Sequence, residues 1–334
     1  MIESNDFTDT NLIKPVKKYA FVFVCQEGEL EIKSLLLAAS LKRFLKCDYE
    51  LIAAVPLPSE KMGKPKKTTI ELLKKMNVKI VNIYNDLIAK ESKLSISLLF
   101  TNKIYCLKVP NYAEKLIFLD SDMLCHSDFF GDICFSIPFN AMRVGVNGTI
   151  PPNGKWKQIY EAVGIKMPKL RIKQIKKREG HPDFTFTPPY FNGGFIAINA
   201  DLANNFCDVW LECYKKIRSK NLIATPFFIE QIALSLALHK MDIPYNILNL
   251  DYPNLPFFHY SNSKNIMLNK KLRILVKSLI NEYPELKEII RNNVDWQFMV
   301  QFSYTILRLK DIIKDFKLII FGLFRNFRKF LNNL

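Results

Sequence analysis

The chain has 334 residues and a formal net charge of +16, with 49% hydrophobic and 24% charged residues. This balance is typical of a globular protein and argues against wholesale disorder, while the positive charge favours an anionic partner such as a nucleotide, a nucleic acid or a lipid surface. The 11 glycines form neither a G-x-G-x-x-G nor a P-loop motif, so a dinucleotide-binding or P-loop fold is disfavoured.

The first hundred residues predict alternating strands and helices. Short apolar runs indicate strands at residues 19–25, 51–55 and 78–83, and apolar residues at helical spacing indicate helices at 28–46 and 69–76. This order is typical of an α/β domain with a mostly parallel sheet.

The alternation continues further along the chain. We expect helices at 94–109, 201–218 and 228–239, and strands at 115–119, 141–146 and 195–198. Residues 166–178 hold seven basic side chains, and we expect a mobile loop beside the active-site crevice, with a solvated surface of no special role as the alternative. Beyond residue 265 the pattern is helical and basic, so we divide the chain into a domain at 17–265 and a C-terminal region at 266–334.

Seven cysteines are scattered without a C-x-x-C pair, which favours reduced thiols over a zinc cage or a disulfide framework. The first residues lack the features of a secretory signal. Apolar runs such as 318–324 are shorter than the roughly 20 residues of a membrane-spanning helix. We therefore expect a cytoplasmic protein that is soluble or lies on a membrane surface.

The most informative segment is LIFLDSD, in which Asp120 and Asp122 follow a buried strand. Side chains two residues apart in an extended segment point the same way, and open α/β sheets bind ligands at the carboxyl ends of their strands. Two close carboxylates repel each other unless a cation lies between them, and a divalent ion completed by substrate phosphates is a suitable occupant. We predict a metal site, with an Asp turn that caps the next helix as the alternative.

Two later segments carry further polar groups. In YFNGGFIAIN, paired glycines before a strand allow close approach of a ligand or another backbone, and Asn192 offers its amide to a hydroxyl; a tight turn is the alternative. In FFHYSNSK, His259 is a candidate metal ligand and Lys264 suits a phosphate, with a structural histidine as the alternative.

In this order, LIFLDSD, YFNGGFIAIN, PFFIEQIALSLAL and PFFHYSNSK resemble glycosyltransferase family 8, the glycogenin-like and bacterial lipooligosaccharide galactosyltransferase-like enzymes of the GT-A fold. The resemblance covers residues 17–265. It implies a GT-A-type α/β domain with a mostly parallel mixed central sheet. It also implies retaining transfer of a hexose from a nucleotide diphosphate sugar, usually a UDP-sugar, to a glycan or glycolipid acceptor, with Mn²⁺ or Mg²⁺ as cofactor.

The same resemblance implies roles for individual residues. It implies that the metal is held by Asp120, Asp122 and His259. It places Lys103 near the donor phosphates.

For the remaining positions, the resemblance implies four further donor contacts and two catalytic side chains. The donor contacts are Cys25 and Gln26 at the nucleotide, Lys264 at the phosphates and Gly193 at the sugar; the catalytic side chains are Asn192 at the sugar and Gln231 on the face where the sugar reacts. The sequence departs from the family pattern in four places. Glu230 replaces the usual aspartate before Gln231, and Asn262 stands where glycine is expected. Lys264 comes one position early and without the usual Pro-Trp, and residues 25–29 lack the usual threonine and tyrosine nucleotide contacts.

Other functions fit parts of the sequence. Haloacid-dehalogenase-like phosphatases also use a strand followed by D-x-D, with the first aspartate as nucleophile, but there the motif normally opens the domain. A basic nucleic-acid-binding protein is compatible with the charge, although no recognised nucleic-acid motif occurs and we expect no such partner. A degenerate transferase that binds its donor without turnover is the third alternative.

Residues 304–334 form an amphipathic tail in which apolar residues recur at helical spacing beside seven basic and two acidic residues. Basic charge beside a phenylalanine-rich stripe is typical of an interfacial helix on anionic lipid. We therefore expect peripheral attachment to the membrane and a lipid-linked glycan acceptor, with a helix packed on the catalytic domain as the alternative.

Overall fold

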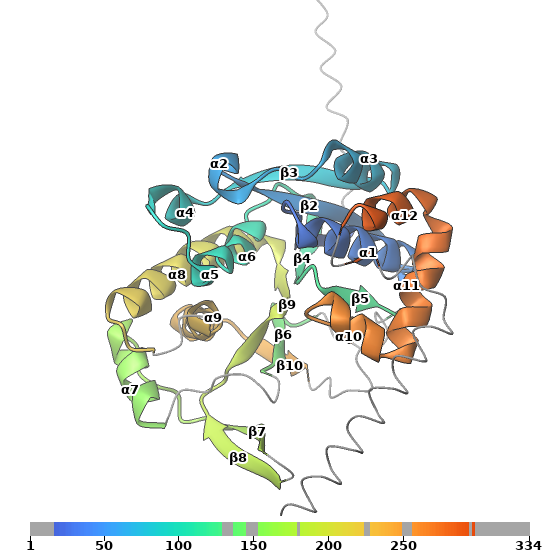
Figure 1. Ribbon diagram of the computed structural model, residues 1–334. Coiled ribbons are helices and arrows are strands. Elements are labelled where there is room, and N and C mark those ends of the chain that lie inside the picture. Colours follow the sequence, from blue (N-terminus) through green and yellow to red (C-terminus); the bar gives the residue numbers. More distant parts are fainter. Residues whose placement is uncertain are drawn as a thin grey trace, which may run out of the picture.

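A seven-stranded sheet forms the centre of the computed structural model, which describes residues 17–128, 136–144, 153–178, 181–223, 228–248, 256–293 and 296–297. The strands of this sheet are β1 (Lys17–Val24), β2 (Tyr49–Leu57), β3 (Val78–Tyr84), β4 (Ala113–Leu119), β6 (Phe139–Arg143), β9 (Phe191–Asn199) and β10 (Tyr245–Leu248). Their order is β10-β6-β9-β4-β1-β2-β3 (Figure 1). Strand β9 runs antiparallel to β4 and β6, whereas the other neighbouring strands are parallel. The predicted α/β fold with a mostly parallel mixed sheet is confirmed.

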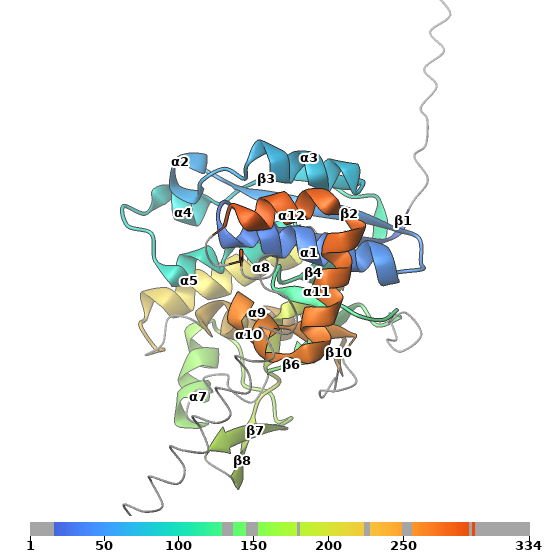
Figure 2. The same cartoon turned by 45° about the vertical axis from the view of Figure 1, so that its right-hand side comes forward.

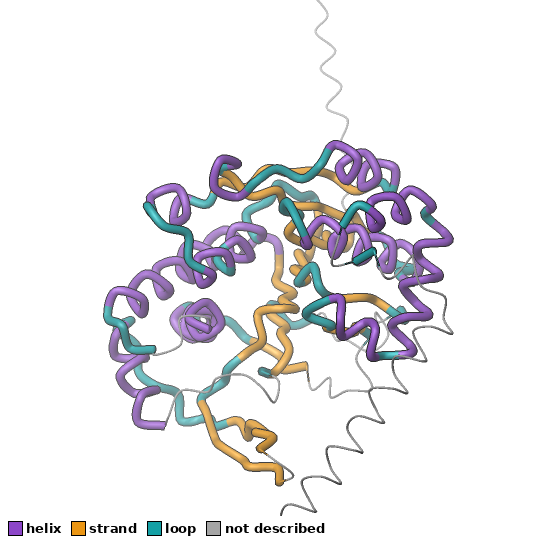
Figure 3. The backbone as a smooth tube through the Cα atoms, in the orientation of Figure 1, coloured by secondary structure: helices purple, strands orange, loops and turns teal. Residues whose placement is uncertain are grey.

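Helices cover both faces of this sheet, as Figure 3 shows by colour. Their bounds are α1 (Glu29–Phe44), α2 (Ser59–Met62), α3 (Lys67–Lys75), α4 (Asp86–Lys90), α5 (Ile96–Leu99), α6 (Asn102–Cys106), α7 (Asn153–Ala162), α8 (Ala200–Ser219), α9 (Ile229–Lys240), α10 (Ser263–Leu268), α11 (Lys270–Glu282) and α12 (Pro284–Arg291). Helices α1, α3, α11 and α12 share one core with the sheet, and α6 to α9 share the other.

Strand β1 shows why this sheet is buried on both faces. Phe21 and Phe23 lie in the core beneath α1, whereas Ala20 and Val22 lie in the core beneath α8 and α9. Side chains alternate between the two faces of a strand, so an unbroken apolar run fills both cores. This is the pattern expected of a parallel sheet covered by helices on each side.

Two small antiparallel ribbons complete the architecture: β5 (Met123–Cys125) with β11 (Phe257–His259), and β7 (Ile172–Arg178) with β8 (His181–Thr187). The expectation of a loop over residues 166–178 is wrong for its second half, which is strand β7. The charge of this segment said nothing about its backbone, whose partner is the following strand. Figure 2 shows the β7–β8 ribbon projecting from the body of the molecule.

The single helix expected at residues 94–109 is replaced by two short helices, α5 and α6. The side chain of Asn85 is buried between them, and its Nδ2 donates hydrogen bonds to Thr101 Oγ1 and Asn102 Oδ1, both at 2.8 Å. Thr101 Oγ1 in turn donates to the carbonyl of Leu98 at 2.6 Å. These tertiary bonds fix the break, and Lys103 follows it directly.

The C-terminal helices pack against the N-terminal half of the chain. Helices α11 and α12 contact α1, and α12 also contacts α3. Arg43 of α1 donates hydrogen bonds to Ser278 and Glu282 of α11. The predicted helical character beyond residue 265 is confirmed up to residue 291, whereas the tail at 304–334 lies outside the described residues. Within the described part of the chain, no helix has both the length and the apolar character to span a membrane.

Candidate active site

Two carboxylates lie at the carboxyl end of the central strand β4. Strand β4 ends at Leu119, and the backbone N–H of Asp120 donates a 2.8 Å hydrogen bond to Gly194 of the neighbouring strand β9. The chain then turns into β5, which begins at Met123. Both aspartate side chains are largely buried, with exposed fractions of 24% for Asp120 and 21% for Asp122.

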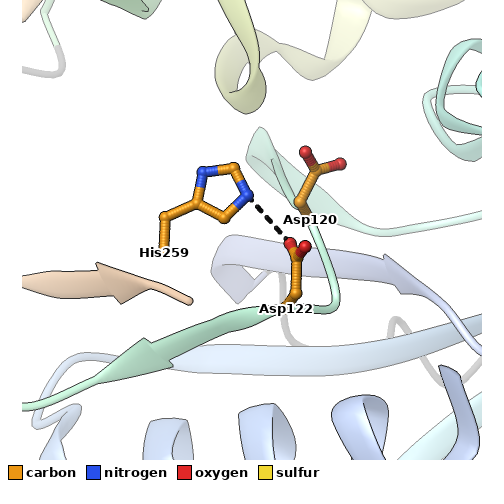
Figure 4. Close-up of side chains that lie close together, drawn as sticks. All are labelled: Asp120, Asp122 and His259. Carbon is orange, nitrogen blue, oxygen red and sulfur yellow. Dashed lines mark ion pairs between the residues drawn. The ribbon is translucent and has the colours of Figure 1, made fainter. Parts of the chain in front are cut away.

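His259 approaches these carboxylates from the last residue of β11. Main-chain pairing sets His259 opposite Met123, next to Asp122 in the chain. The Nε2 atom of His259 lies 3.0 Å from Asp122 Oδ1 (Figure 4). One ligand atom from each of Asp120, Asp122 and His259 lies within 4.8 Å of the other two. Two carboxylate oxygens and an imidazole nitrogen suit Mn²⁺ or a similar divalent ion.

The ionisation states of this pair are coupled through its hydrogen bond. Burial by itself would lower the pKa of His259, but the hydrogen bond and charge of Asp122 outweigh burial and raise it. Burial would likewise raise the pKa of Asp122, but the bond to His259 and the nearby cations lower it. Asp122 and His259 therefore each favour the charged form of the other.

A buried cation lies on the other side of Asp120. Lys103 is 6% exposed, and its Nζ lies 3.2 Å from Asp120 Oδ1 and 3.3 Å from Glu230 Oε1. Burial alone would lower the pKa of Lys103, but these two carboxylates raise it above the usual range. The ammonium is therefore held in its charged form at the wall of the site.

Gly193 and Gly194 bring strand β9 close to the side chains of Lys103 and Asp120. Asn192 Oδ1 accepts a 2.7 Å hydrogen bond from the backbone N–H of Gly194. A Cβ atom at Gly194 would lie 2.9 Å from Asp120 Oδ2, which is too close, whereas a Cβ at Gly193 would lie 3.4 Å from Glu230 Oε1. Close approach of the backbone to the carboxylate therefore requires glycine at position 194.

A cavity of about 350 Å³ opens beside the two aspartates. Its lining comes from three parts of the chain: Val24 to Leu30 after β1, Ile96 to Lys103 around α5 and α6, and Phe118 to Asp122 after β4, although not every residue in these stretches takes part. The cavity joins an apolar wall to the carboxylates, which is the composition expected of a pocket for a polar cofactor or substrate.

Several residues predicted from the sequence meet at this place. The structure brings together Asp120, Asp122, His259, Lys103, Asn192 and Gly193, and Gln26 lines the cavity. The side chain of Gln231 is half-buried on α9, and the adjacent Glu230 makes the contact with Lys103.

Two predicted donor contacts are not part of the cavity. Cys25, the residue after β1, is fully buried in the core beneath α1, and burial raises the pKa of its thiol to about 12. Lys264 is exposed on α10 and does not line the cavity, because the chain turns into that helix at Ser263.

Sequence reasoning assigned no role to Glu230, which is 2% exposed and faces Lys103. Its Oε2 atom has no hydrogen-bond partner among the described residues. A carboxylate near the start of the mostly apolar helix α9 was the available signal, because glutamate is almost never fully buried without a partner.

The model of the family described as Rhodobacterales glycosyltransferase domain matches residues 21–242 of the chain. No curated protein is significantly similar to it. Three solved structures are similar in fold. The galactosyltransferase LgtC in complex with donor and acceptor sugar analogs is 11% identical, with 78% of this chain and 95% of that chain covered and a TM-score of 0.48.

For mouse xyloside xylosyltransferase 1 in its apo form, the identity is 13%, the coverage is 70% of this chain and 85% of that chain, and the TM-score is 0.40. For an active-site mutant of LgtC, the identity is 11%, the coverage is 65% of this chain and 69% of that chain, and the TM-score is 0.42.

Proposed function

The chain belongs to the Rhodobacterales glycosyltransferase domain family, and on that premise we propose that it transfers a hexose from a UDP-sugar to a glycan or glycolipid acceptor. The observation that carries the proposal is the convergence of Asp120, Asp122 and His259 beside the cavity. This family membership replaces the phosphatase alternative, in which the first aspartate would act as a nucleophile.

The three ligand residues fit a divalent cation by their chemistry, because two carboxylate oxygens and one imidazole nitrogen lie within reach of one centre. A bound Mn²⁺ or Mg²⁺ would supply positive charge to the departing diphosphate. His259 lies outside the segment matched by the family model, which ends at residue 242. Its pairing with β5 is the structural reason to include it.

Lys103 and Glu230 orient the substrate in this proposal. The ammonium of Lys103 is fixed between two carboxylates, so it adds positive charge at the wall of the cavity without having to reorganise. Glu230 is buried and does not line the cavity, so in this proposal it acts by holding the Lys103 ammonium in place.

The proposal includes retention of the anomeric configuration. In a retaining transfer the acceptor proton can pass to the departing phosphate, so no protein carboxylate has to act as a general base. Asp120 and Glu230 both form ion pairs with Lys103. This fits a mechanism in which neither carboxylate takes the acceptor proton. An NMR spectrum of the first product tests the point, since an inverted anomeric centre would contradict retention.

Donor hydrolysis and donor binding test the metal and the nucleotide together. We expect the thermal unfolding temperature to rise with a UDP-hexose and Mn²⁺, and to rise less with a GDP-sugar, because a ligand that binds the native state stabilises it. The Asp122→Asn variant should fold but lose both the shift and Mn²⁺-dependent hydrolysis. The same change at the exposed Asp128 is the matched control and should alter neither.

Attachment to the cytoplasmic face of a membrane is the second part of the proposal. Leu268 and Ile274 of α10 and α11 are 53% and 54% exposed, and Lys264, Lys270 and Lys271 are exposed near them in the sequence. The sequence has no acidic residue between positions 252 and 281. Exposed apolar side chains among lysines favour the surface of an anionic bilayer, and the amphipathic tail at 304–334 would add to this attraction.

Co-sedimentation with vesicles tests this attachment. The full chain should sediment with phosphatidylserine-containing vesicles at low salt and remain in the supernatant with phosphatidylcholine alone. Leu268→Ser with Ile274→Ser, and separately a chain that ends before Tyr304, should each reduce the bound fraction. If the full chain never sediments, a saccharide in solution replaces the lipid-linked glycan as the expected acceptor.

A further inference from the structure

The metal-site histidine is followed at once by a strained turn. The backbone N–H of Asn262 donates a 2.6 Å hydrogen bond to the carbonyl of Tyr260, so the chain reverses around Ser261 alone. Ser261 has a φ of +61°, which is in the left-handed region. Such a three-residue turn with positive φ is rare and strained for a residue other than glycine. It persists only where surrounding contacts hold it.

A lysine near the N-terminus of the chain contacts this turn. Lys33 lies on α1, is 6% exposed, and its Nζ donates a 2.7 Å hydrogen bond to the carbonyl of Ser261 across 228 residues of sequence. Glu29, one helical turn earlier, lies 3.4 Å from the same Nζ. A buried ammonium is costly unless it is paired and hydrogen-bonded, so these two partners fix its place. The strained turn is therefore tied to a rigid helix.

The turn is also tied to the metal-binding aspartate. The backbone N–H of Tyr260 donates a 3.0 Å hydrogen bond to the carbonyl of Asp122, directly after the pairing of His259 with Met123. Strand β11 has only three residues, so the position of its last residue depends on the adjoining turn. A shift of the turn at Ser261 would therefore move His259 relative to Asp122.

We propose that Lys33 is a positioning residue for the metal site: by holding the turn at Ser261 it sets His259 at the distance from Asp122 that a divalent ion requires. The proposal rests on the proposed function, since it presupposes that the site binds metal. It assigns the role to this lysine rather than to Lys264, which is exposed and does not line the cavity.

A simple charge effect would have the opposite sign. Removal of a cation near Asp122 would strengthen the binding of a divalent ion if Lys33 acted by its charge alone. Removal of a positioning contact would weaken it, because the ligands would no longer be held at the right separation. Residues that orient metal ligands typically change metal affinity by about 10- to 100-fold when they are lost.

The experiment measures Mn²⁺ binding to the full chain directly, by the electron paramagnetic resonance signal of free Mn²⁺, without any sugar donor. Lys33→Met should weaken binding about 10- to 100-fold. Ser261→Gly in the same chain should restore most of the affinity, because glycine adopts positive φ without strain. Lys42→Met is the matched control, since Lys42 is an exposed lysine on the same helix.

Each outcome decides the proposal. Unchanged or tighter binding in Lys33→Met overturns it, and so does a loss that Ser261→Gly fails to restore. If Lys33→Met does not fold, as judged by circular dichroism, Lys33→Gln retains a donor and should show a smaller loss, whereas wild-type affinity in that variant contradicts the idea. If the unchanged chain binds no Mn²⁺, the metal clause of the proposed function fails together with this inference.

Discussion

The two carboxylates of the D-x-D segment are two residues apart but are held in different ways. Asp120 contacts a buried lysine that is shared with Glu230, and all three groups lie on elements packed against the main sheet. Asp122 contacts His259, which is carried by a ribbon of three residues per strand. The ion pair on the Lys103 side is therefore deeply buried, whereas the pair of Asp122 and His259 is more exposed.

The difference indicates that the two sides should respond differently to mutation. Loss of the Lys103 cation leaves the carboxylates of Asp120 and Glu230 without a counter-charge. This should reduce the free energy of unfolding of the whole domain. A change on the His259 side should alter metal binding with less effect on folding, because the side chains of His259 and Asp122 are more exposed than those of Lys103 and Glu230. Variants on each side test this contrast, from the largest expected effect to the smallest.

Lys103→Met should reduce the free energy of unfolding by about 3–5 kcal/mol, because it leaves the buried carboxylates without their cation. Urea unfolding measures this loss. The matched change at Lys108, whose side chain is 35% exposed in its pair with Asp208, should cost less than about 1 kcal/mol. Addition of Glu230→Gln to Lys103→Met should recover part of the loss. A loss at Lys108 as large as that at Lys103 would contradict the contrast.

His239 is a half-buried ionisable group that, among the described residues, forms no ion pair with a carboxylate, in contrast to Lys103. Burial lowers the pKa of His239 to about 4, and Tyr160 Oη lies 2.7 Å from its Nδ1. Because the folded pKa lies below that of the unfolded chain, the stabilisation is complete above about pH 6.5 and is lost as the pH falls towards 4. The loss is on the order of 3 kcal/mol.

The pH dependence of unfolding for wild type and His239→Gln isolates this contribution. The two stability curves should converge between pH 6.5 and 4, since only the wild type has this histidine to protonate on unfolding. Parallel curves over that range would show that the histidine is not buried in its neutral form.

Gly194→Ala should displace the side chain of Asp120. Its Cβ would lie 2.8 Å from Asn192 Oδ1 and 2.9 Å from Asp120 Oδ2, so these groups must move. We expect a loss of about 1–3 kcal/mol in stability, together with weaker Mn²⁺ binding in a titration. Gly193→Ala is the matched control, because its Cβ would make ordinary contacts from 3.4 Å. Equal effects at both glycines would count against the close approach at Gly194.

Lys264→Ala should have the smallest effect. Lys264 is exposed and does not line the cavity, so we expect a change of less than about 0.5 kcal/mol in stability and an unchanged affinity for UDP-hexose by calorimetry. A clear loss of donor affinity would restore the role that the family resemblance implies for this lysine.

The sequence was sufficient for most of the sheet and for part of the site. The apolar runs at β1, β2 and β4 are strands with mostly buried side chains, because a continuous apolar segment needs two covered faces. The strand predicted at β3 also forms, but at the edge of the sheet, where much of it is exposed. The D-x-D segment was recognisable because it follows such a strand directly. Local patterns therefore located the carboxyl end of β4, where polar side chains must face a ligand or solvent.

Other interpretations were wrong because they depended on partner segments that the local pattern does not reveal. The interruption between α5 and α6 depends on the buried Asn85, and strand β7 forms because β8 lies beside it. Cys25 follows β1 as Gln26 does, yet its side chain lies in the core while Gln26 lines the cavity.

By itself the sequence determined the α/β class, the main strands along the chain and the position of Asp120 and Asp122, because short apolar runs mark buried strands and the alternation of strands with helices marks a mostly parallel sheet. The tertiary structure decided which cations serve these carboxylates. Lys103 of α6 forms an ion pair with Glu230 of α9. Lys33 donates a hydrogen bond to Ser261, which lies 228 residues further along the chain. Periodicity reports which face of an element is buried, but an ion pair depends on the position of two side chains within a few ångströms, and only the packed chain sets that distance.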